Sequence, residues 1–205
     1  MKKISALNQN TIKKKTLSSV RQRNNIINVS KNKIASFLND FYPLLKEKIE
    51  TGKKILICGN GGSASDSNHF AAELTGKFKS NKRKLISCIS LSSNSSSITS
   101  IANDFNFSQI FSKQIEALGR EGDICICLST SGKSKNIIKA IKTCNKKKIT
   151  TVGFFGKYKS ERLNKCKFTL NINSNNTALI QELHYITLHL ICELLEDDFI
   201  NAKKI

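Results

Sequence analysis

The spacing of apolar residues along the chain changes near residue 52. Between residues 34 and 49, apolar side chains recur every three or four positions, which predicts an amphipathic helix. Thr51 and Gly52 follow it and are typical of a helix end. Beyond them, short apolar runs of strand length alternate with segments of helical spacing. The predicted strands are 55–58, 85–91, 124–128, 149–155 and 168–172, and the predicted helices are 68–78, 107–118, 134–146 and 177–198.

Continuous apolar strands that alternate with helices are typical of a parallel sheet covered on both faces. The pattern predicts an α/β protein with one doubly wound domain, in which a flavodoxin-like sheet of five parallel strands is flanked by helices. We assign residues 33–205 to this domain. Residues 1–32 form a basic N-terminal helical arm that could pack on another subunit. Ligands of such sheets bind at the carboxyl ends of the strands, so the residues that follow each strand are the candidates for chemistry.

Charge is the feature of the composition that points most strongly away from a simple globular enzyme. The chain has 205 residues and a formal net charge of +19, which raises the possibility of nucleic-acid binding. However, its lysines are spread along the whole chain, and no aromatic residues interleave the basic clusters as base stacking would favour. We interpret the lysines as solvated surface and expect no specific nucleic-acid partner.

Cysteine usage indicates a reducing compartment. The seven cysteines are odd in number and form no CxxC pair, so a disulfide framework is not expected. No apolar stretch reaches about 18 residues, and no apolar segment follows the basic start, so neither a membrane span nor a secretory signal is expected. We predict a cytoplasmic protein. Five of the cysteines lie in apolar runs, where a free thiol behaves as a small hydrophobic group: Cys58, Cys88, Cys125, Cys127 and Cys192.

A glycine-rich turn, Gly59 to Asp66, follows the first predicted strand and leads into a helix. Its glycines allow backbone N–H groups to approach a ligand closely, and a helix N-terminus favours an anion. The spacing lacks the third glycine of G-x-G-x-x-G and the Gly-Lys-Ser/Thr of a nucleotide P-loop, so neither dinucleotide nor nucleotide binding is predicted. A tight turn without a ligand remains an alternative.

A second polar loop, Leu128 to Ser134, follows the third predicted strand. It offers four hydroxyl groups at a helix N-terminus, where they and the free N–H groups could hold a phosphate. Helix capping by serine or threonine is the alternative, but a cap requires one hydroxyl.

The histidines supply the third candidate constellation. His69 and Glu73 share one helix face at i and i+4. In the last predicted helix, Gln181 and His189 are about 80° apart around the axis, whereas His184 points elsewhere. Two imidazoles, a carboxylate and an amide could hold zinc, although glutamine is a rare zinc ligand. An ordinary ion pair between His69 and Glu73 is the alternative.

Together these segments strongly resemble the sedoheptulose 7-phosphate isomerases of the sugar-isomerase (SIS) domain superfamily. The resemblance covers residues 33–197, and the two Ser/Thr turns are common to the superfamily. The pairs His69 with Glu73 and Gln181 with His189 are more specific to the heptose enzymes. The matching segments are Gly59-Asn60-Gly61-Gly62-Ser63, His69-Phe70-Ala71-Ala72-Glu73-Leu74-Thr75-Gly76, Asn103-Asp104-Phe105, Gly119-Arg120-Glu121-Gly122-Asp123, Ser129-Thr130-Ser131-Gly132 and Gln181-Glu182-Leu183-His184.

The resemblance implies an aldose–ketose isomerase that converts sedoheptulose 7-phosphate to D-glycero-D-manno-heptose 7-phosphate for lipopolysaccharide or other surface heptoses. Glu73 would be the base and His189 the acid. It also implies a homotetramer with active sites at subunit contacts. One zinc ion per subunit would be bound by His69, Glu73, Gln181 and His189. The substrate would be contacted by Asn60, Gly61, Gly62, Ser63, Glu73, Asn103, Asp104, Ser129, Thr130, Ser131, Ser134 and Gln181.

Three positions depart from the family pattern: the family commonly has Asn in place of Lys133, Asp in place of Ala178 and Arg in place of Leu179. These changes bear on subunit contacts or rate and leave the four central residues in place. One rival interpretation is a non-catalytic SIS-fold protein that binds the bacterial replication initiator, but such proteins lack the acidic residue and the last histidine. Another is a phosphosugar-sensing regulator, for whose usual DNA-binding module residues 1–30 are too short.

Overall fold

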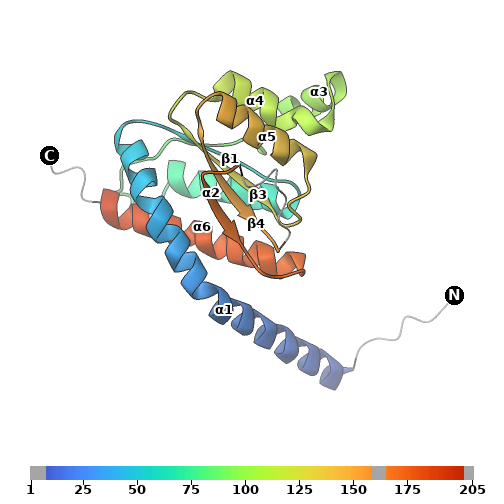
Figure 1. Ribbon diagram of the computed structural model, residues 1–205. Helices are drawn as coiled ribbons and strands as arrows, with labels where there is room; N and C mark the ends of the chain where they lie inside the picture. Colours follow the sequence, from blue (N-terminus) through green and yellow to red (C-terminus); the bar gives the residue numbers. More distant parts are fainter. Residues whose placement is uncertain (1–7, 158–164, 201–205) are drawn as a thin grey trace.

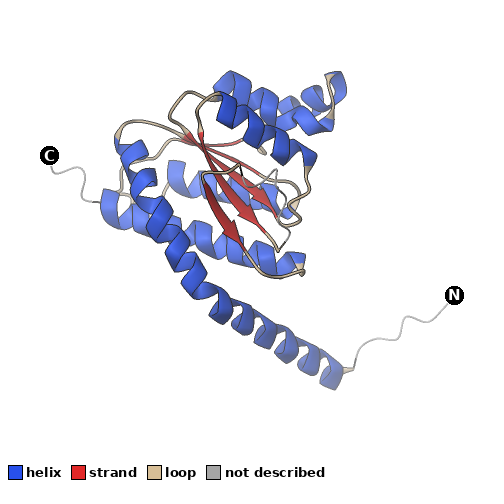
Figure 2. Cartoon of the chain, viewed as in Figure 1, coloured by secondary structure: helices blue, strands red, loops and turns tan. Residues whose placement is uncertain are grey.

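A five-stranded, all-parallel sheet forms the centre of the computed structural model, which describes residues 8–157 and 165–200 (Figures 1 and 2). The strand order is β2-β1-β3-β4-β5, the flavodoxin-like order, and it confirms the predicted fold class. The order reverses between β1 and β3, and their carboxyl ends are therefore the expected ligand-binding edge. The strands are β1 (Ile55–Cys58), β2 (Cys88–Ser90), β3 (Ile124–Ser129), β4 (Thr150–Phe155) and β5 (Phe168–Asn171).

Strand β2 is shorter than the predicted 85–91. Leu85 is 66% exposed, and the backbone N–H of Ile86 donates to the carbonyl of Leu74 instead of a strand (3.0 Å). Pairing begins only at Cys88, which lies opposite Ile55 at the start of the four-residue β1. The short β1 therefore limits the length of the edge strand β2.

Helices cover both faces of the sheet (Figure 1). Alternate strand residues face opposite sides, so Ile55 and Ile57 pack towards α1, α2 and α6, whereas Leu56 and Cys58 pack towards α4 and α5. Helix α3, which was not predicted, buries none of its residues. The helices are α1 (Gln9–Glu50), α2 (Gly62–Thr75), α3 (Ser95–Asp104), the 3-10 turn η1 (Phe107–Gln109), α4 (Ile110–Leu118), α5 (Lys135–Lys146) and α6 (Thr177–Phe199).

Helix α1 is a single helix of 42 residues that passes without a break through residues 32 and 33, where the arm was predicted to meet the domain. The side chain of Asn8 caps it by accepting from the N–H of Thr11 (2.9 Å). Its buried residues begin only at Ser30, and the first half projects from the body of the molecule (Figure 1). Residues 1–7 of the predicted arm lie outside the described residues.

Helix α6 is long and apolar enough to meet a simple criterion for a membrane span, which the sequence pattern did not predict. It lies against α1 and α2 and buries Leu183, Leu188, Ile191 and Leu195 in the core below the sheet. A mostly apolar composition is therefore expected for it as a core helix.

Candidate active site at the carboxyl edge of the sheet

The turn after β1 is built for close backbone approach. A Cβ atom on Gly59 would lie 2.6 Å from the Cβ of Ser63, and Gly61 has a φ of +56°, so both positions favour glycine. The Asn60 amide exchanges two hydrogen bonds with the amide of Asn136 on α5 (3.0 and 2.8 Å). This pair joins the β1 turn to the helix that follows β3.

The loop after β3 is organised by its own hydroxyls. Ser129 Oγ is 3.3 Å from Ser134 Oγ and accepts from the N–H of Gly132 (3.1 Å). Ser131 Oγ accepts from the N–H of Lys133 (3.2 Å). The side chain of Ser134 makes no capping bond to α5, although Ser134 is its N-cap residue. The hydroxyls therefore shape the loop, and helix capping does not account for them.

Helices α2 and α6 lie side by side and bring three distant side chains together. His69 Nε2 lies 3.1 Å from Glu73 Oε1 on its own helix and 3.3 Å from His189 Nε2 on α6. One ring nitrogen carries either one proton or one lone pair, so it cannot satisfy both contacts as simple hydrogen bonds. Tyr185 lies beside both imidazoles, with ring centroids 5.3 Å from His69 and 4.2 Å from His189.

The separation of the two imidazoles in this cluster fits a shared cation, although the ligand atoms of His69, Glu73 and His189 do not all lie within 4.8 Å of one another. Two nitrogen ligands at the usual distance from a tetrahedral zinc ion are about 3.4 Å apart, close to the 3.3 Å between the two imidazole nitrogens. Glu73 and His189 each contact His69. Gln181 is directed elsewhere, because its Nε2 donates to Asp66 Oδ1 (3.2 Å).

Asp66 is a polar residue of this region that the sequence interpretation missed. It is buried, and its Oδ2 has no hydrogen-bond partner among the described residues. Desolvation raises the pKa of its carboxyl group, and the Gln181 hydrogen bond opposes that shift. Its position three residues before His69 on α2 was the available signal. A pocket of about 310 Å³ opens here, lined by Asp66, Ala178, Gln181, Glu182 and Tyr185.

His184 points away from the other two histidines, as its helical position predicted. It is fully buried, and its Nε2 lies 3.2 Å from the carbonyl oxygen of Phe155 at the end of β4. Burial lowers the pKa of His184 to about 4. The ring is therefore neutral at physiological pH and belongs to the core.

Asn103 and Asp104 lie apart from the other predicted site residues. Both are exposed at the end of α3, where Asn103 Nδ2 donates to Asp104 Oδ1 (2.9 Å). Within the described residues, no hydrogen bond connects this pair to the two polar turns or to the histidine cluster. Asn103 and Asp104 are therefore not linked by hydrogen bonds to the rest of the predicted set in the part of the chain that the structure describes.

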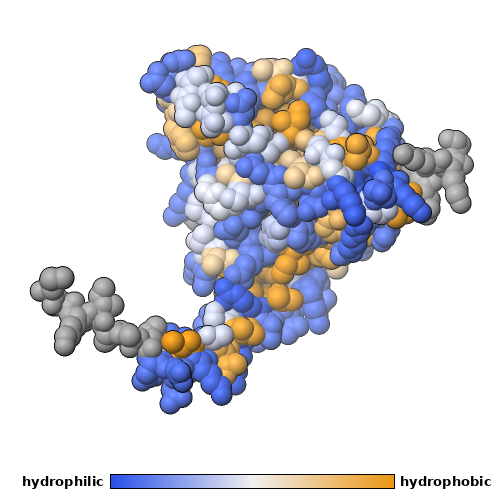
Figure 3. All heavy atoms as spheres, turned by 180° about the vertical axis from the view of Figure 1, so that it is seen from behind, coloured by the Kyte–Doolittle hydropathy of each residue, from blue (hydrophilic) through white to orange (hydrophobic). Residues whose placement is uncertain are grey.

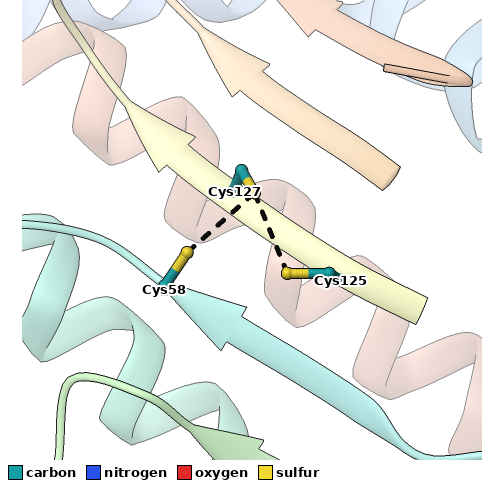
Figure 4. A group of neighbouring side chains, drawn as sticks. All are labelled: Cys58, Cys125 and Cys127. Atoms are coloured by element: carbon teal, nitrogen blue, oxygen red, sulfur yellow. Dashed lines mark hydrogen bonds between the residues drawn. The ribbon is translucent and has the colours of Figure 1, made fainter. Parts of the chain in front are cut away.

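Three buried thiols form a separate group on the other face of the sheet (Figure 4). The sulfur of Cys127 lies 3.9 Å from those of Cys58 and Cys125, and all three lie within 4.8 Å of one another. Within the described residues, this is the one group of three His, Cys, Asp or Glu side chains close enough for a metal ion by that criterion. The sulfurs could hold an ion, but hydrogen bonding among the thiols together with their burial raises the thiol pKa values, and their full burial leaves no open position for a substrate.

Comparisons with known proteins agree with this fold. The SIS domain family matches residues 20–156. A phosphoheptose isomerase of Clostridium acetobutylicum is 46% identical over 152 residues, which cover 74% of this chain and 77% of that protein. Another, from Campylobacter concisus, is 43% identical over 156 residues, which cover 76% of this chain and 82% of that protein.

A solved structure of a phosphoheptose isomerase has the same fold as this chain. The phosphoheptose isomerase of Neisseria gonorrhoeae superposes with a TM-score of 0.84 at 30% identity, over 91% of this chain and 100% of that one. Sequence and fold therefore agree over most of the chain. The chain belongs to the SIS domain family, among its phosphoheptose isomerases, and is a sugar-phosphate isomerase.

Proposed function

We propose that this enzyme interconverts sedoheptulose 7-phosphate and D-glycero-D-manno-heptose 7-phosphate. The relatives named phosphoheptose isomerase support a seven-carbon sugar phosphate as the substrate. The observation that carries the proposal is the cluster in which Glu73 and His189 both contact His69. It offers a carboxylate and an imidazole, the two kinds of group that an aldose–ketose isomerisation requires.

In this reaction Glu73 removes a proton from C1 of the ketose and returns it to C2. His189 donates a proton to the oxygen on C2 and then accepts the proton of the C1 hydroxyl, so no proton is gained or lost overall. Each group has the chemistry for its step, since carboxylates and imidazoles accept and donate protons near neutral pH. The aromatic rings of Tyr185 and Phe78 flank His189.

We propose that His69, Glu73 and His189 hold a zinc ion, with Gln181 as a fourth ligand if its amide turns from Asp66. Zinc bound there would polarise the sugar carbonyl and stabilise the negative charge of the enediolate. Glu73 has two oxygens, so one can serve the metal while the other accepts the proton. The thiol group around Cys127 is a poorer candidate for this role, because it is closed to the substrate.

The two polar turns would anchor the distant phosphate. Ser129, Thr130, Ser131 and Ser134 supply hydroxyls and N–H groups at the start of α5. The turn residues 60–63 supply further N–H groups at the start of α2. The Asn60–Asn136 pair joins this turn to α5, the helix that follows the Ser129–Ser134 loop. Helix N-termini favour anions through their free N–H groups and the helix dipole.

We further propose that four copies assemble and complete the sites at their contacts. Ile12, Leu17 and Val20 on the projecting half of α1 are each about half exposed, and apolar side chains are visible on this arm in Figure 3. An apolar groove of about 430 Å³ lies between α1 and α6, lined mainly by aliphatic side chains. A second copy of α1 fits this groove, and an adjoining copy could supply the exposed Asn103 and Asp104.

The test of the function is incubation of the full chain with sedoheptulose 7-phosphate, followed by NMR of the sugar. We expect the aldose signals of the heptose 7-phosphate to appear, and to increase when zinc is added after chelation. Turnover of other ketose phosphates but not of this one would contradict the proposed substrate. Light scattering of the same sample measures the mass of the assembly, and a monomer would contradict the tetramer.

A DNA-binding measurement tests the rival interpretation, in which the positive charge serves an initiator-binding protein. If the lysines are only solvated surface, the protein should bind duplex DNA weakly, and the binding should vanish at physiological salt. Tight, sequence-selective binding at that salt would favour the rival.

A further inference from the structure

A buried arginine joins the end of α2 to α6. Arg83 lies between α2 and β2, and its side chain is 1% exposed. Its Nε donates to Glu196 Oε2 on α6 (2.8 Å), and the Glu196 side chain is 5% exposed. Charges buried to this depth are costly unless their remaining donors and acceptors are satisfied.

The rest of the guanidinium group serves the C-terminal end of α2. Nη2 donates to the carbonyl oxygen of Glu73 (2.7 Å) and, at longer range, to those of Leu74 (3.3 Å) and Gly76 (3.2 Å). Helix ends leave such carbonyls without intrahelical partners, and a cation is favoured there. The last turn of α2 has no basic residue of its own. Arg83 therefore caps α2 from outside the helix and contacts the backbone of Glu73.

Glu196 completes the link on the α6 side. It lies seven residues after His189, so both residues lie on the same face of α6. Its second carboxylate oxygen accepts from the N–H of Ser80, in the segment that leads to Arg83. The carbonyl of Glu73 is thus connected through Arg83 and Glu196 to the helix that carries His189.

We propose that Arg83 and Glu196 are positioning residues, which hold α2 and α6 in register so that Glu73 and His189 keep their separation. This inference rests on the proposed function, because it assigns to the two residues the alignment of the reacting groups. The physical reason is that proton transfer is sensitive to position, and a displacement of about 1 Å can cost about 100-fold in rate.

The chain contains a matched buried pair outside the site. Lys54 Nζ lies 2.5 Å from Asp123 Oδ2, and the Asp123 side chain is 3% exposed. Asp123 also accepts from the backbone N–H groups of Lys54 (3.1 Å) and Arg120 (2.8 Å). These residues immediately precede β1 and β3, at the opposite edge of the sheet from the site. A substitution of Asp123 therefore disturbs a comparable buried carboxylate without touching α2 or α6.

The kinetic test compares Glu196→Gln and Arg83→Lys with Asp123→Asn in the full chain. We expect the first two to lower kcat about 10- to 100-fold, with KM within about twofold because the phosphate is held elsewhere. Asp123→Asn should lower the melting temperature but leave kcat unchanged below it. If the kcat losses at Glu196 and Arg83 do not exceed that of Asp123→Asn, the proposal is overturned.

A second measurement is independent of turnover. The chain has three histidines, so a labelled sample gives three imidazole spin systems by NMR. Glu196→Gln should shift the signals of His69 and His189 and leave that of His184 unchanged, whereas Asp123→Asn should move none of them. Equal shifts at all three rings, or none, would show that the link is only structural. If the wild type lacks activity on the heptose phosphate, the proposed function fails, while this measurement still reports on the alignment.

Discussion

The two sides of the candidate site use their polar groups differently. On the helix-pair side, formed by His69, Glu73 and His189, side chains from two helices contact one another, and among the described residues these side chains have no hydrogen bond to a backbone group. On the loop side, Ser129 to Ser134, hydroxyls bind the N–H groups of their own loop. Side chains without backbone hydrogen bonds suit proton transfer. A loop whose N–H groups and hydroxyls are held in place suits a phosphate, whose charge does not change during the reaction. The comparison predicts that kcat depends on the first side and KM on the second.

The largest effect is expected from Glu73→Gln, which keeps the shape of the side chain and removes its basicity. Steady-state kinetics should show kcat lowered by about 100-fold or more, with a small change in KM. Glu116→Gln on α4 is the control, because Glu116 is an exposed partner of Lys113 and the substitution should be neutral. A variant that keeps its kcat and loses substrate affinity would reverse the assignment of the two sides.

A smaller effect is expected from Gly132→Ala on the loop side. Gly132 has a φ of +64°, where alanine costs about 1 kcal/mol and shifts the loop N–H groups. We expect KM to rise about tenfold, the equivalent of about 1.4 kcal/mol, with kcat nearly unchanged. Gly52→Ala is matched to it, since Gly52 has a φ of +75° with no atom near its Cβ position and follows α1. If both alanine variants change KM alike, the loop is not the anchor.

The smallest effect is a thermal shift that separates the two histidines of α6. Zinc at 100 times its Kd should stabilise the wild type by about 2.7 kcal/mol, or about 5 to 10 °C for a chain of this size. His69→Ala and His189→Ala should each remove most of that shift. His184→Ala should lower the starting melting temperature, because it removes a buried ring, but keep the shift. A shift that survives in all three variants would place zinc elsewhere, with the thiols as the next candidate.

Much of the fold could be predicted from the sequence because its core elements carry strong apolar patterns. The continuous runs at 124–128 and 149–155 became β3 and β4 with small changes at their ends. Helix α3 could not be predicted in this way, because it buries no residues and no apolar spacing marks it. The first half of α1 was predicted only as a basic helical arm of residues 1–32, because its residues before Ser30 are not buried and give little apolar spacing.

The site was predictable only where its residues are close in sequence. His69 and Glu73 follow from helical spacing, and the contact of His69 with His189 required the pairing of α2 with α6 across 120 positions. Asp66 and Arg83 were missed for the same reason, since their partners Gln181 and Glu196 lie more than a hundred residues away. Without its partner, each looks like an ordinary charged surface residue.

The projecting half of α1 has a consequence for the folding of that helix. Residues 9–29 would extend about 30 Å at 1.5 Å per residue, but none of them is fully buried, and their contacts with the core include the partly buried Ile26 and the Arg23–Glu182 ion pair. Lys13, Lys14 and Lys15 repel one another and lie near the positive end of the helix dipole. Such a segment is marginally helical by itself and depends on propagation from the packed half. Because the proposed contacts with a second copy would cover this segment, its helix–coil equilibrium should follow protein concentration. Dilution should then lower the helical circular dichroism signal before the sheet is affected.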